Sequence, residues 1–520
     1  MTNASRILLQ DVDNSYVTQG IASGISGFVG RFSRGPINDA SMIITNPTML
    51  RKIFGSKDSG TGDLLLADRA LANGGSLRIV NVGHYTDVTD PSTLAAIKAG
   101  AVTVTNSDGT PVGLFKLVPK YPGIEYNKMR VKLTPVSATG TFSMEIYIEG
   151  EEYYTLEQYS GLRVGRSTAV DASFLKEVAE ASLLVNVEYM DTSALATDSA
   201  RLPKAETLSF TGGSNGAAVV PSDYVGSNAG KTGFYALSPY TDMSDFGAPA
   251  ITDTEVNIGG ATYADSRKDI EFLAALPNSL STVTALVAAR RLITVNSKYY
   301  SVWAGGLKVK DPVTGQTREI TSVADVMAIG HRTDSDFYPW FSQAQLVRGT
   351  VNNALGVVRN FGNPSDYDDL NLLAQAGINV TAMDRGTISV KGNFSGQTAG
   401  TSKASYRNIV RLLVYIKRSL RPTLERYLEE PNDFNTWKNL YNEVKPFLNY
   451  LEDNQAVYPG GAVWKGDQYA SKMSELTINT EPELAMGKYR AELHLNPINS
   501  INDLVVSISL NNVSLEITEY

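Results

Sequence analysis

The loop at 226–232, with the sequence GSNAGKT, is the clearest group of residues that could do chemistry. A glycine-rich turn followed by Lys and Thr is typical of loops that bind phosphate, because backbone N–H groups and the lysine neutralise the anion. The spacing departs from that motif, since three residues instead of four separate Gly226 from Gly230. We therefore expect an ordinary loop, and the alternative is a nucleotide-binding enzyme that uses Gly230, Lys231 and Thr232.

Other side chains with catalytic or metal-binding chemistry are scattered. His84, His331 and His494 have no carboxylate or second histidine at the spacing of metal ligands, so no metal site is predicted. The acidic group at 366–369 could serve hydrolysis, but a solvated loop is the simpler interpretation. The serines of the glycine-rich segment 20–32 do not form the G-x-S-x-G motif of serine hydrolases. We assign no catalytic, cofactor-binding or metal-binding residue, and we expect no enzyme.

The composition is that of an ordinary globular chain too long for one core. Its 520 residues are 42% hydrophobic and 19% charged, which predicts three or so domains. The formal net charge of -8 offers no broad basic surface, so no nucleic-acid partner is expected. The absence of cysteine excludes disulfides and thiol catalysis. Neither a signal peptide nor a membrane-spanning run is recognisable, so synthesis and residence in the cytosol without membrane insertion is the default expectation.

The elements that would position these side chains alternate between helix and strand near the start of the chain. Asn46 and Pro47 begin a helix that Gly55 ends, a second helix is predicted over 63–73, and a strand over 77–82. The same pattern recurs further on, with helices predicted near 265–275 and 281–293 and a strand at 299–303. These segments favour an α/β architecture.

The residues from about 86 to 205 differ in character. Short β-rich runs occur there, such as 129–134 and 142–148, with one helix predicted over 172–180. We predict an inserted, mostly β domain.

The strongest helix is predicted over 406–420. Its apolar residues recur at helical spacing along one stripe: Tyr406, Ile409, Leu412, Leu413, Ile416 and Leu420. Five cations fall on the opposite face: Arg407, Arg411, Lys417, Arg418 and Arg421. Pro422 should end or kink this helix, and a second helix is predicted over 433–451. Such a basic face exceeds what solubility requires in an acidic chain, although a solvated or internally paired face is an equal alternative.

Both ends of the chain are predicted to be extended arms. The first arm contains Ile7 and Leu9, and the last stretch, 504–520, alternates apolar and polar residues at the period of a strand. Its apolar positions are Val506, Ile508, Leu510, Val513, Leu515 and Ile517. A lone two-stranded ribbon is marginal in water, so these strands must pair elsewhere in the chain or with another copy of it. From the segment alone, pairing within the chain is favoured.

Several segments, in order along the chain, carry a family resemblance. They are GISGFVGRFSRGPIN at 24–38, ANGGSLRIVNV at 72–82, YPGIEYNKMRVKL at 121–133, FTGGSNG at 210–216, PWFSQAQLVRG at 339–349, YRNIVRLLVYIKRSL at 406–420 and EEPNDFNTW at 429–437. Together they resemble the contractile tail sheath protein of myovirus phages, particularly its T-even-like branch. The chain departs from the family pattern in two places: Val410, Arg411 and Leu412 replace its usual VRR, and AVWKGD at 462–467 replaces a strand that contains cysteine.

The resemblance implies a multidomain α/β (α+β) fold, with a core sheath domain built from both chain termini, an inserted mostly β domain and extended terminal arms. The implied division is an N-terminal arm at 1–20, the first part of the core at 21–85, the inserted outer domain at 86–205, a middle domain at 206–335, the C-terminal core at 336–503 and a C-terminal β arm at 504–520. It also reverses the preference for the last stretch, because the arms of that family add strands to the sheets of neighbouring subunits.

The implied function is structural. Subunits stack as hexameric rings around a tail tube, and contraction drives the tube through a bacterial envelope without any cofactor. The implied partners are other copies of the chain, the tail tube protein, and the baseplate and tail terminator proteins. The implied location is a virion tail assembled in the host cytoplasm, and the alternative is the sheath of a bacteriocin-like or secretion device. The five cations of the 406–420 helix are then candidates to face the tube.

Overall fold

The computed structural model describes residues 24–55, 61–84, 98–107, 111–149, 154–165, 175–361, 367–398 and 402–500. The chain divides into two compact units, with the boundary between Glu430 and Pro431. The predicted arms at 1–20 and 504–520 lie outside the described residues. The finer division into six parts stays a prediction.

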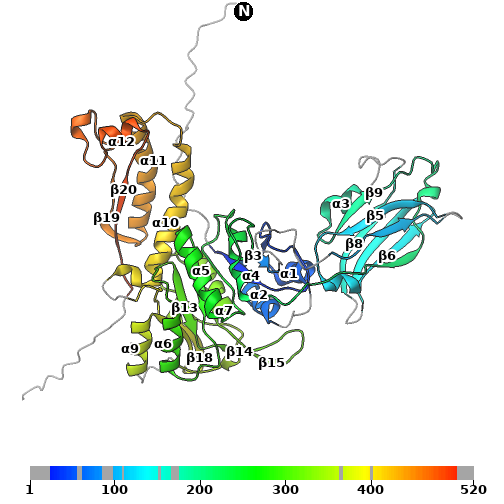
Figure 1. Cartoon of the computed structure of the whole chain (residues 1–520), viewed down its shortest axis with the longest axis horizontal. Helices are drawn as coiled ribbons and strands as arrows, with labels where there is room; N and C mark the ends of the chain where they lie inside the picture. The colour runs from blue at the N-terminus through cyan, green and yellow to red at the C-terminus, as the bar shows by residue number, and fades with distance from the viewer. Residues whose placement is uncertain are drawn as a thin grey trace, which may run out of the picture. The chain divides into compact units, whose positions relative to one another are not determined.

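An eight-stranded sheet forms the centre of the first unit (Figure 1). From edge to edge its strands are β18 (Thr387–Lys391), β17 (Ile378–Asp384), β13 (Tyr300–Ala304), β12 (Glu271–Ala275), β11 (Asp245–Gly247), β1 (Ile25–Gly30), β3 (Ser76–Asn81) and β2 (Ile43–Ile44). Neighbours from β17 to β3 run parallel, and both edge strands run antiparallel. In this order, the three strands at one end of the sheet come from residues 25–81, and the five strands at the other end come from residues 245–391.

Helices cover both faces of this sheet, because successive side chains of a buried strand point to opposite faces. Val29 belongs to one hydrophobic core and Phe28 to a second. The first core also receives side chains from α5 (Thr254–Arg267), α6 (Val283–Leu292), α9 (Tyr367–Ala376) and α10 (Arg407–Arg426). The second receives them from α1 (Pro47–Phe54), α2 (Asp63–Ala72) and α7 (Val323–Asp336). The expected α/β class is confirmed as a three-layered arrangement.

Local signals explain several element ends in this unit. The side chain of Asn46 accepts a hydrogen bond from the N–H of Met49 at 2.8 Å, and Gly55 ends α1 with a φ of 104° that favours glycine. The helix predicted near 265–275 is wrong. There α5 ends at Arg267 and β12 follows, because all five residues of β12 are buried between the helical layers and a strand buried on both faces has no alternation.

Shorter elements also belong to the first unit. They are α4 (Pro221–Val225), α8 (Gln345–Arg348) and a three-stranded sheet of β15 (Thr317–Ile320), β14 (Leu307–Lys310) and β16 (Gly356–Val357). The helix α10 continues through Pro422 to Arg426 and does not end at the proline.

An inserted β-rich part lies between β3 and β11 in the sequence. One of its sheets contains β4 (Val102–Thr105), β5 (Gly113–Pro119) and β9 (Val185–Tyr189), and the other contains β10 (Glu206–Ser209), β6 (Met129–Val136), β7 (Thr141–Ile148) and β8 (Tyr154–Leu162). With α3 (Lys176–Ala181), these strands enclose a hydrophobic core of their own. The predicted mostly β insertion is therefore confirmed in character.

Two ion pairs attach the insertion to the central sheet and its helices. Arg34 follows β1 and lies 3.2 Å from Glu125, and Lys52 of α1 lies 3.4 Å from Glu157 of β8. Both glutamates are buried.

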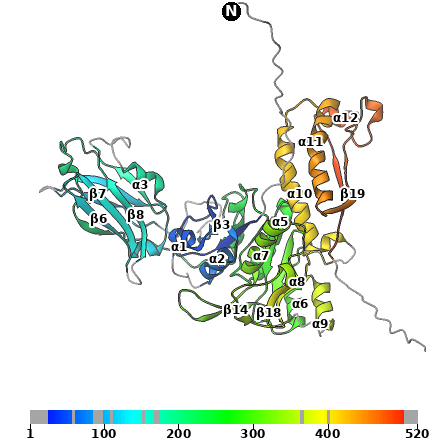
Figure 2. The same cartoon turned by 180° about the vertical axis from the view of Figure 1, so that it is seen from behind.

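The second unit contains α11 (Phe434–Asp453), α12 (Glu481–Ala485) and a ribbon of β19 (Val457–Lys465) and β20 (Glu492–Pro497). Figure 2 shows α11 beside β19, and Asp433 caps this helix by accepting from the N–H of Thr436 at 2.8 Å. Among the described residues of both units, no helix has the length and apolar character needed to cross a membrane.

Candidate functional site

The 226–232 loop has a different geometry from a phosphate loop. It follows the short helix α4 instead of a strand, and the Lys231 ammonium donates to Asn228 Oδ1 at 2.7 Å. Lys231 has a left-handed φ of 51°, and the next element is a short 3-10 helix, Gly233–Leu237. A phosphate loop joins a strand to the N-terminus of an α-helix, so the nucleotide-binding alternative lacks its structural context.

Each histidine has a different neighbour. His84 Nδ1 lies 2.9 Å from Asp223 Oδ2, His331 contacts the carbonyl of Gly24, and His494 Nε2 lies 3.0 Å from Glu492 Oε2. Within the described ranges, no group of three or more His, Asp or Glu side chains is placed to hold a metal ion.

Two members of the acidic group at 366–369 belong to α9. Asp368 and Asp369 lie in the first turn of that helix, where carboxylates interact favourably with the helix dipole. Asp366 lies outside the described residues, as does Ser23, while Ser26 is part of β1.

Three of the five cations of the 406–420 helix that were candidates to face the tube do not lie on an exposed face. The side chains of Arg407, Arg411 and Arg418 are buried in α10. The first two meet acids from distant parts of the chain: Arg407 Nε lies 2.7 Å from Glu271 Oε1, and Arg411 Nη2 lies 2.6 Å from Asp334 Oδ1. Arg418 donates to the backbone carbonyls of Thr241 and Asp242.

The other two cations of α10 reach solvent. The Lys417 ammonium donates to the Tyr299 hydroxyl at 2.6 Å, and partial burial, with Lys268 nearby, lowers the pKa of Lys417. Arg421 is 52% exposed and pairs with Glu425 at 2.8 Å. Only these two of the five candidates remain available to a partner.

The buried cations face a row of polar residues at the amino edge of the parallel sheet. Ser26, Asp245 and Glu271 lie side by side in register near the starts of β1, β11 and β12. Glu271 also accepts from Ser301 at 2.7 Å. Ligands of open parallel sheets bind beyond the carboxyl ends of the strands, so a row at the opposite edge favours a structural role.

Asp245 is the exceptional member of this row. Burial raises the pKa of Asp245 to about 6, and Arg407, Ser26 and Arg411 only partly offset that effect. The sequence did not single out this carboxyl, because one Asp before a short apolar strand carries no recognisable signal.

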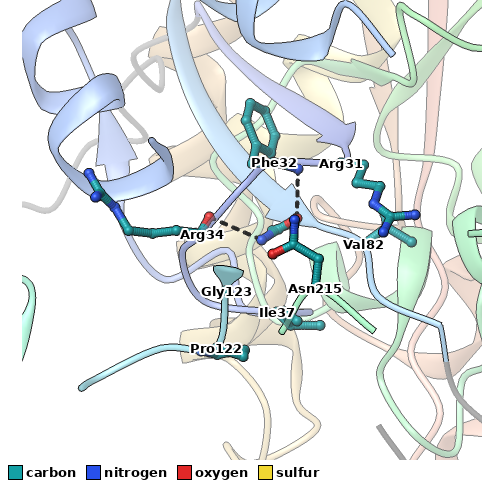
Figure 3. Close-up of a pocket in the computed structure, with 9 residues that line it drawn as sticks. Arg31, Phe32, Arg34, Ile37, Val82, Pro122, Gly123 and Asn215 are labelled. Atoms are coloured by element: carbon teal, nitrogen blue, oxygen red, sulfur yellow. Dashed lines mark hydrogen bonds between the residues drawn. The ribbon is translucent and has the colours of Figure 1, made fainter. Parts of the chain in front are cut away.

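A small pocket lies beyond the carboxyl ends of β1 and β3, where an enzyme of this architecture would bind its ligand (Figure 3). The side chain of Asn81 bridges the chain there, accepting from the N–H of Phe32 at 2.9 Å and donating to the carbonyl of Arg34 at 3.2 Å. Gly123 and Asn215 of the insertion also line it. Its free volume of about 10 Å³ has room for about one water molecule. The insertion therefore fills the usual ligand position.

In the second unit, Asp467 organises the loop that joins β19 to α12. Its carboxylate accepts from the N–H groups of Thr477, Ile478 and Asn479 and from two of their side chains. Burial opposes ionisation, but these hydrogen bonds outweigh it and hold the pKa of Asp467 well below its usual range.

The β19–β20 ribbon contains two strands within the described part of the chain. The strand candidates for contact between subunits all lie outside that part: Ile7, Leu9, Val506, Ile508, Leu510, Val513, Leu515 and Ile517. Their pairing stays a prediction.

Solved structures of similar fold are known. A sheath tail protein from Listeria innocua matches with a TM-score of 0.57 and 15% identity, over 87% of this chain and 90% of that one. One from Desulfitobacterium hafniense matches with a TM-score of 0.54 and 15% identity, over 89% and 94%. The helical sheath of the anti-feeding prophage in its contracted state matches with a TM-score of 0.55 and 12% identity, over 98% and 100%. No protein-family model and no curated protein sequence matches the chain.

Proposed function

We propose that this chain is the structural subunit of a contractile tail sheath. The observation that carries the proposal is the fold match, which covers nearly the whole chain and nearly the whole of each sheath protein. Subunits stack as hexameric rings around a tail tube, and their rearrangement drives the tube through a bacterial envelope. The finer assignment to the T-even-like branch of myovirus phages rests on the sequence segments alone, and a bacteriocin-like or secretion device is the alternative particle.

Electron microscopy of the purified chain tests this proposal. We expect long tubes or stacked rings, formed without nucleotide. Co-expression with a tail tube protein should give sheathed tubes. Compact monomers at high concentration, together with saturable ATP turnover, would contradict it.

The proposed subunits are joined by exchanged strands. The β19–β20 ribbon supports this idea, because it has two strands within the described residues, and an added strand would use main-chain hydrogen bonds that survive rotation of whole subunits. We expect deletion of 513–520 or of 1–13 to leave a folded subunit that no longer polymerises. As a matched pair, Leu515→Asp should block assembly while Ser514→Asp, on the alternate face, should not. A sharp fall in the melting temperature of the truncated subunit would instead place these strands within their own chain.

The tube is proposed to contact Lys417 and Arg421, the two candidates on α10 that solvent reaches. Screened ionic contacts contribute about 1 kcal/mol or less each, and sixfold repetition in every ring multiplies them while still allowing release. We expect the double variant Lys417→Glu/Arg421→Glu to coat tubes poorly, and raised salt to weaken attachment. Arg385→Glu is the control, since Arg385 is 94% exposed in another part of the fold. Normal coating by the double variant would place the contact elsewhere.

A further inference from the structure

The row at the amino edge of the sheet contains two adjacent carboxyl groups. Asp245 and Glu271 are partners in the parallel register of β11 and β12, and such strands lie about 4.8 Å apart. Both residues are about 1% exposed, so solvent does not screen them. Two carboxylates that share a buried site cannot both ionise freely, and one of them holds its proton to higher pH.

The charged groups around the row come from α7 and α10. Glu271 is paired with Arg407, and Asp334 of α7 is paired with Arg411, so each of these ions already has its partner. Asp245 makes no ion pair within 4.0 Å among the described residues, although Arg407, Arg411 and the more distant Arg418 act on it. On α7, His331 contacts the carbonyl of Gly24, next to β1. Asp245 is therefore the carboxyl of this group that has no direct ion-pair partner among the described residues.

Unpartnered polar atoms concentrate at this place. Five buried atoms accept or donate no hydrogen bond: Asp245 Oδ1, Glu271 Oε2, Asp334 Oδ2, Arg407 Nη2 and Gln343 Nε2. A buried polar atom without a partner costs free energy and calls for an explanation, such as a bound proton or water. A carboxyl that keeps its proton needs no counter-charge, which removes the largest of these costs.

We propose that Asp245 and Glu271 form a proton-binding site, and that release of its proton loosens the attachment of α10 to the sheet. The helix α10 responds most to this change, because Arg407 and Arg411 both project from it into the group of acidic side chains. Once Asp245 ionises, its charge competes with Glu271 and Asp334 for these two guanidinium groups. In the sequence, residues 427–430 connect the end of α10 to the second unit.

Infrared spectroscopy of the soluble full-length chain tests for the proton directly. A carboxylic acid C=O band should disappear as the pH rises through about 6, the value raised by burial. The component of this band that titrates near pH 6 should be absent in Asp245→Asn. This measurement on the unmodified chain does not depend on how well a variant folds, and a missing band would overturn the proposal.

Hydrogen exchange of the peptide that covers α10 tests the consequence. After correction for intrinsic rates, its protection should fall severalfold between about pH 5 and pH 8 in the unmodified chain and stay constant in Asp245→Asn. Because histidines in general also titrate in this range, His331→Gln is the control and should keep the response. A response that survives in Asp245→Asn, or disappears in His331→Gln, would overturn the proposal. Sheath assembly is scored separately by electron microscopy, so failure here leaves the proposed function untouched.

Discussion

Truncation of Arg411 should destabilise the first unit, whereas the same truncation of Arg421 on the same helix should not. Arg411 is buried, pairs with Asp334 at 2.6 Å and donates to the Pro339 carbonyl at 3.0 Å. Arg411→Ala leaves both acceptors in a site that water does not reach. Arg421→Ala removes a side chain that is 52% exposed.

The magnitude follows from burial. Removing one partner of a buried ion pair costs about 3–5 kcal/mol, because the remaining charge is left uncompensated. An exposed pair contributes about 0–1 kcal/mol. Unfolding entropy is about 2.1 cal/mol/K per residue, or about 0.9 kcal/mol/K for the unit Met1–Glu430 if it unfolds cooperatively. Arg411→Ala should therefore lower its melting temperature by about 3–6 °C, and Arg421→Ala by about 1 °C or less.

Differential scanning calorimetry of the two full-length variants measures this contrast. Arg411→Glu should be worse than Arg411→Ala, since it places a third carboxylate beside Asp245 and Asp334. Equal melting temperatures for Arg411→Ala and Arg421→Ala would refute the reasoning. If the melting temperatures are equal, Arg411 does not stabilise the fold, and a loss of tube binding in Arg411→Glu could no longer be ascribed to misfolding.

Three further predictions concern other parts of the chain. Asp467→Asn should remove part of the acid sensitivity of the chain. The pKa of Asp467 is lowered in the folded state, so its contribution to the free energy of unfolding is present above the unfolded pKa of about 3.9 and is lost as the pH falls below that value. Acid unfolding followed by circular dichroism measures this loss, and an unchanged acid transition would argue against the role of its hydrogen bonds. Lys231→Ala should change the free energy of unfolding by no more than about 0.5 kcal/mol and leave assembly unchanged, because the Lys231 ammonium only donates to Asn228 in an exposed loop. A measurable loss of nucleotide binding in this variant would instead support the enzyme alternative. Glu125→Ala should expose the junction between the insertion and β1 to limited proteolysis, because it leaves the buried Arg34 without its carboxylate partner at a cost of about 3–5 kcal/mol. Glu149→Ala, which removes one partner of an exposed pair within the insertion, is the control and should not change the proteolysis pattern.

Local signals in the sequence predicted much of the fold. The cap at Asn46, the glycine stop at Gly55 and the apolar period of α10 depend on residues within a turn or two of each other, so the sequence predicts each of them. The strand β12 lies within a predicted helix, because a short apolar run buried on both sides has no period of its own.

The candidate site could not be predicted in the same way. A helical wheel shows that Arg407 and Arg411 lie opposite an apolar stripe, but not whether that second face meets solvent or protein. Their partners Glu271 and Asp334 are 136 and 77 residues away in the sequence, on a different strand and a different helix. A basic face that is internally paired looks the same in sequence as one that binds a tube.

The insertion between β3 and β11 also has a consequence for the order in which the chain can fold during synthesis. Ile25 of β1 and Ser244, which it bonds beside β11, are 219 residues apart. At about 5–20 residues per second, the ribosome needs on the order of tens of seconds between these two strands. The insertion has its own core and can fold in that interval, whereas the β1 edge that later receives β11 stays uncovered. The nascent chain therefore passes through a stage with an open, apolar strand edge, at which a chaperone, or the sheet of another nascent copy, can bind before β11 is made.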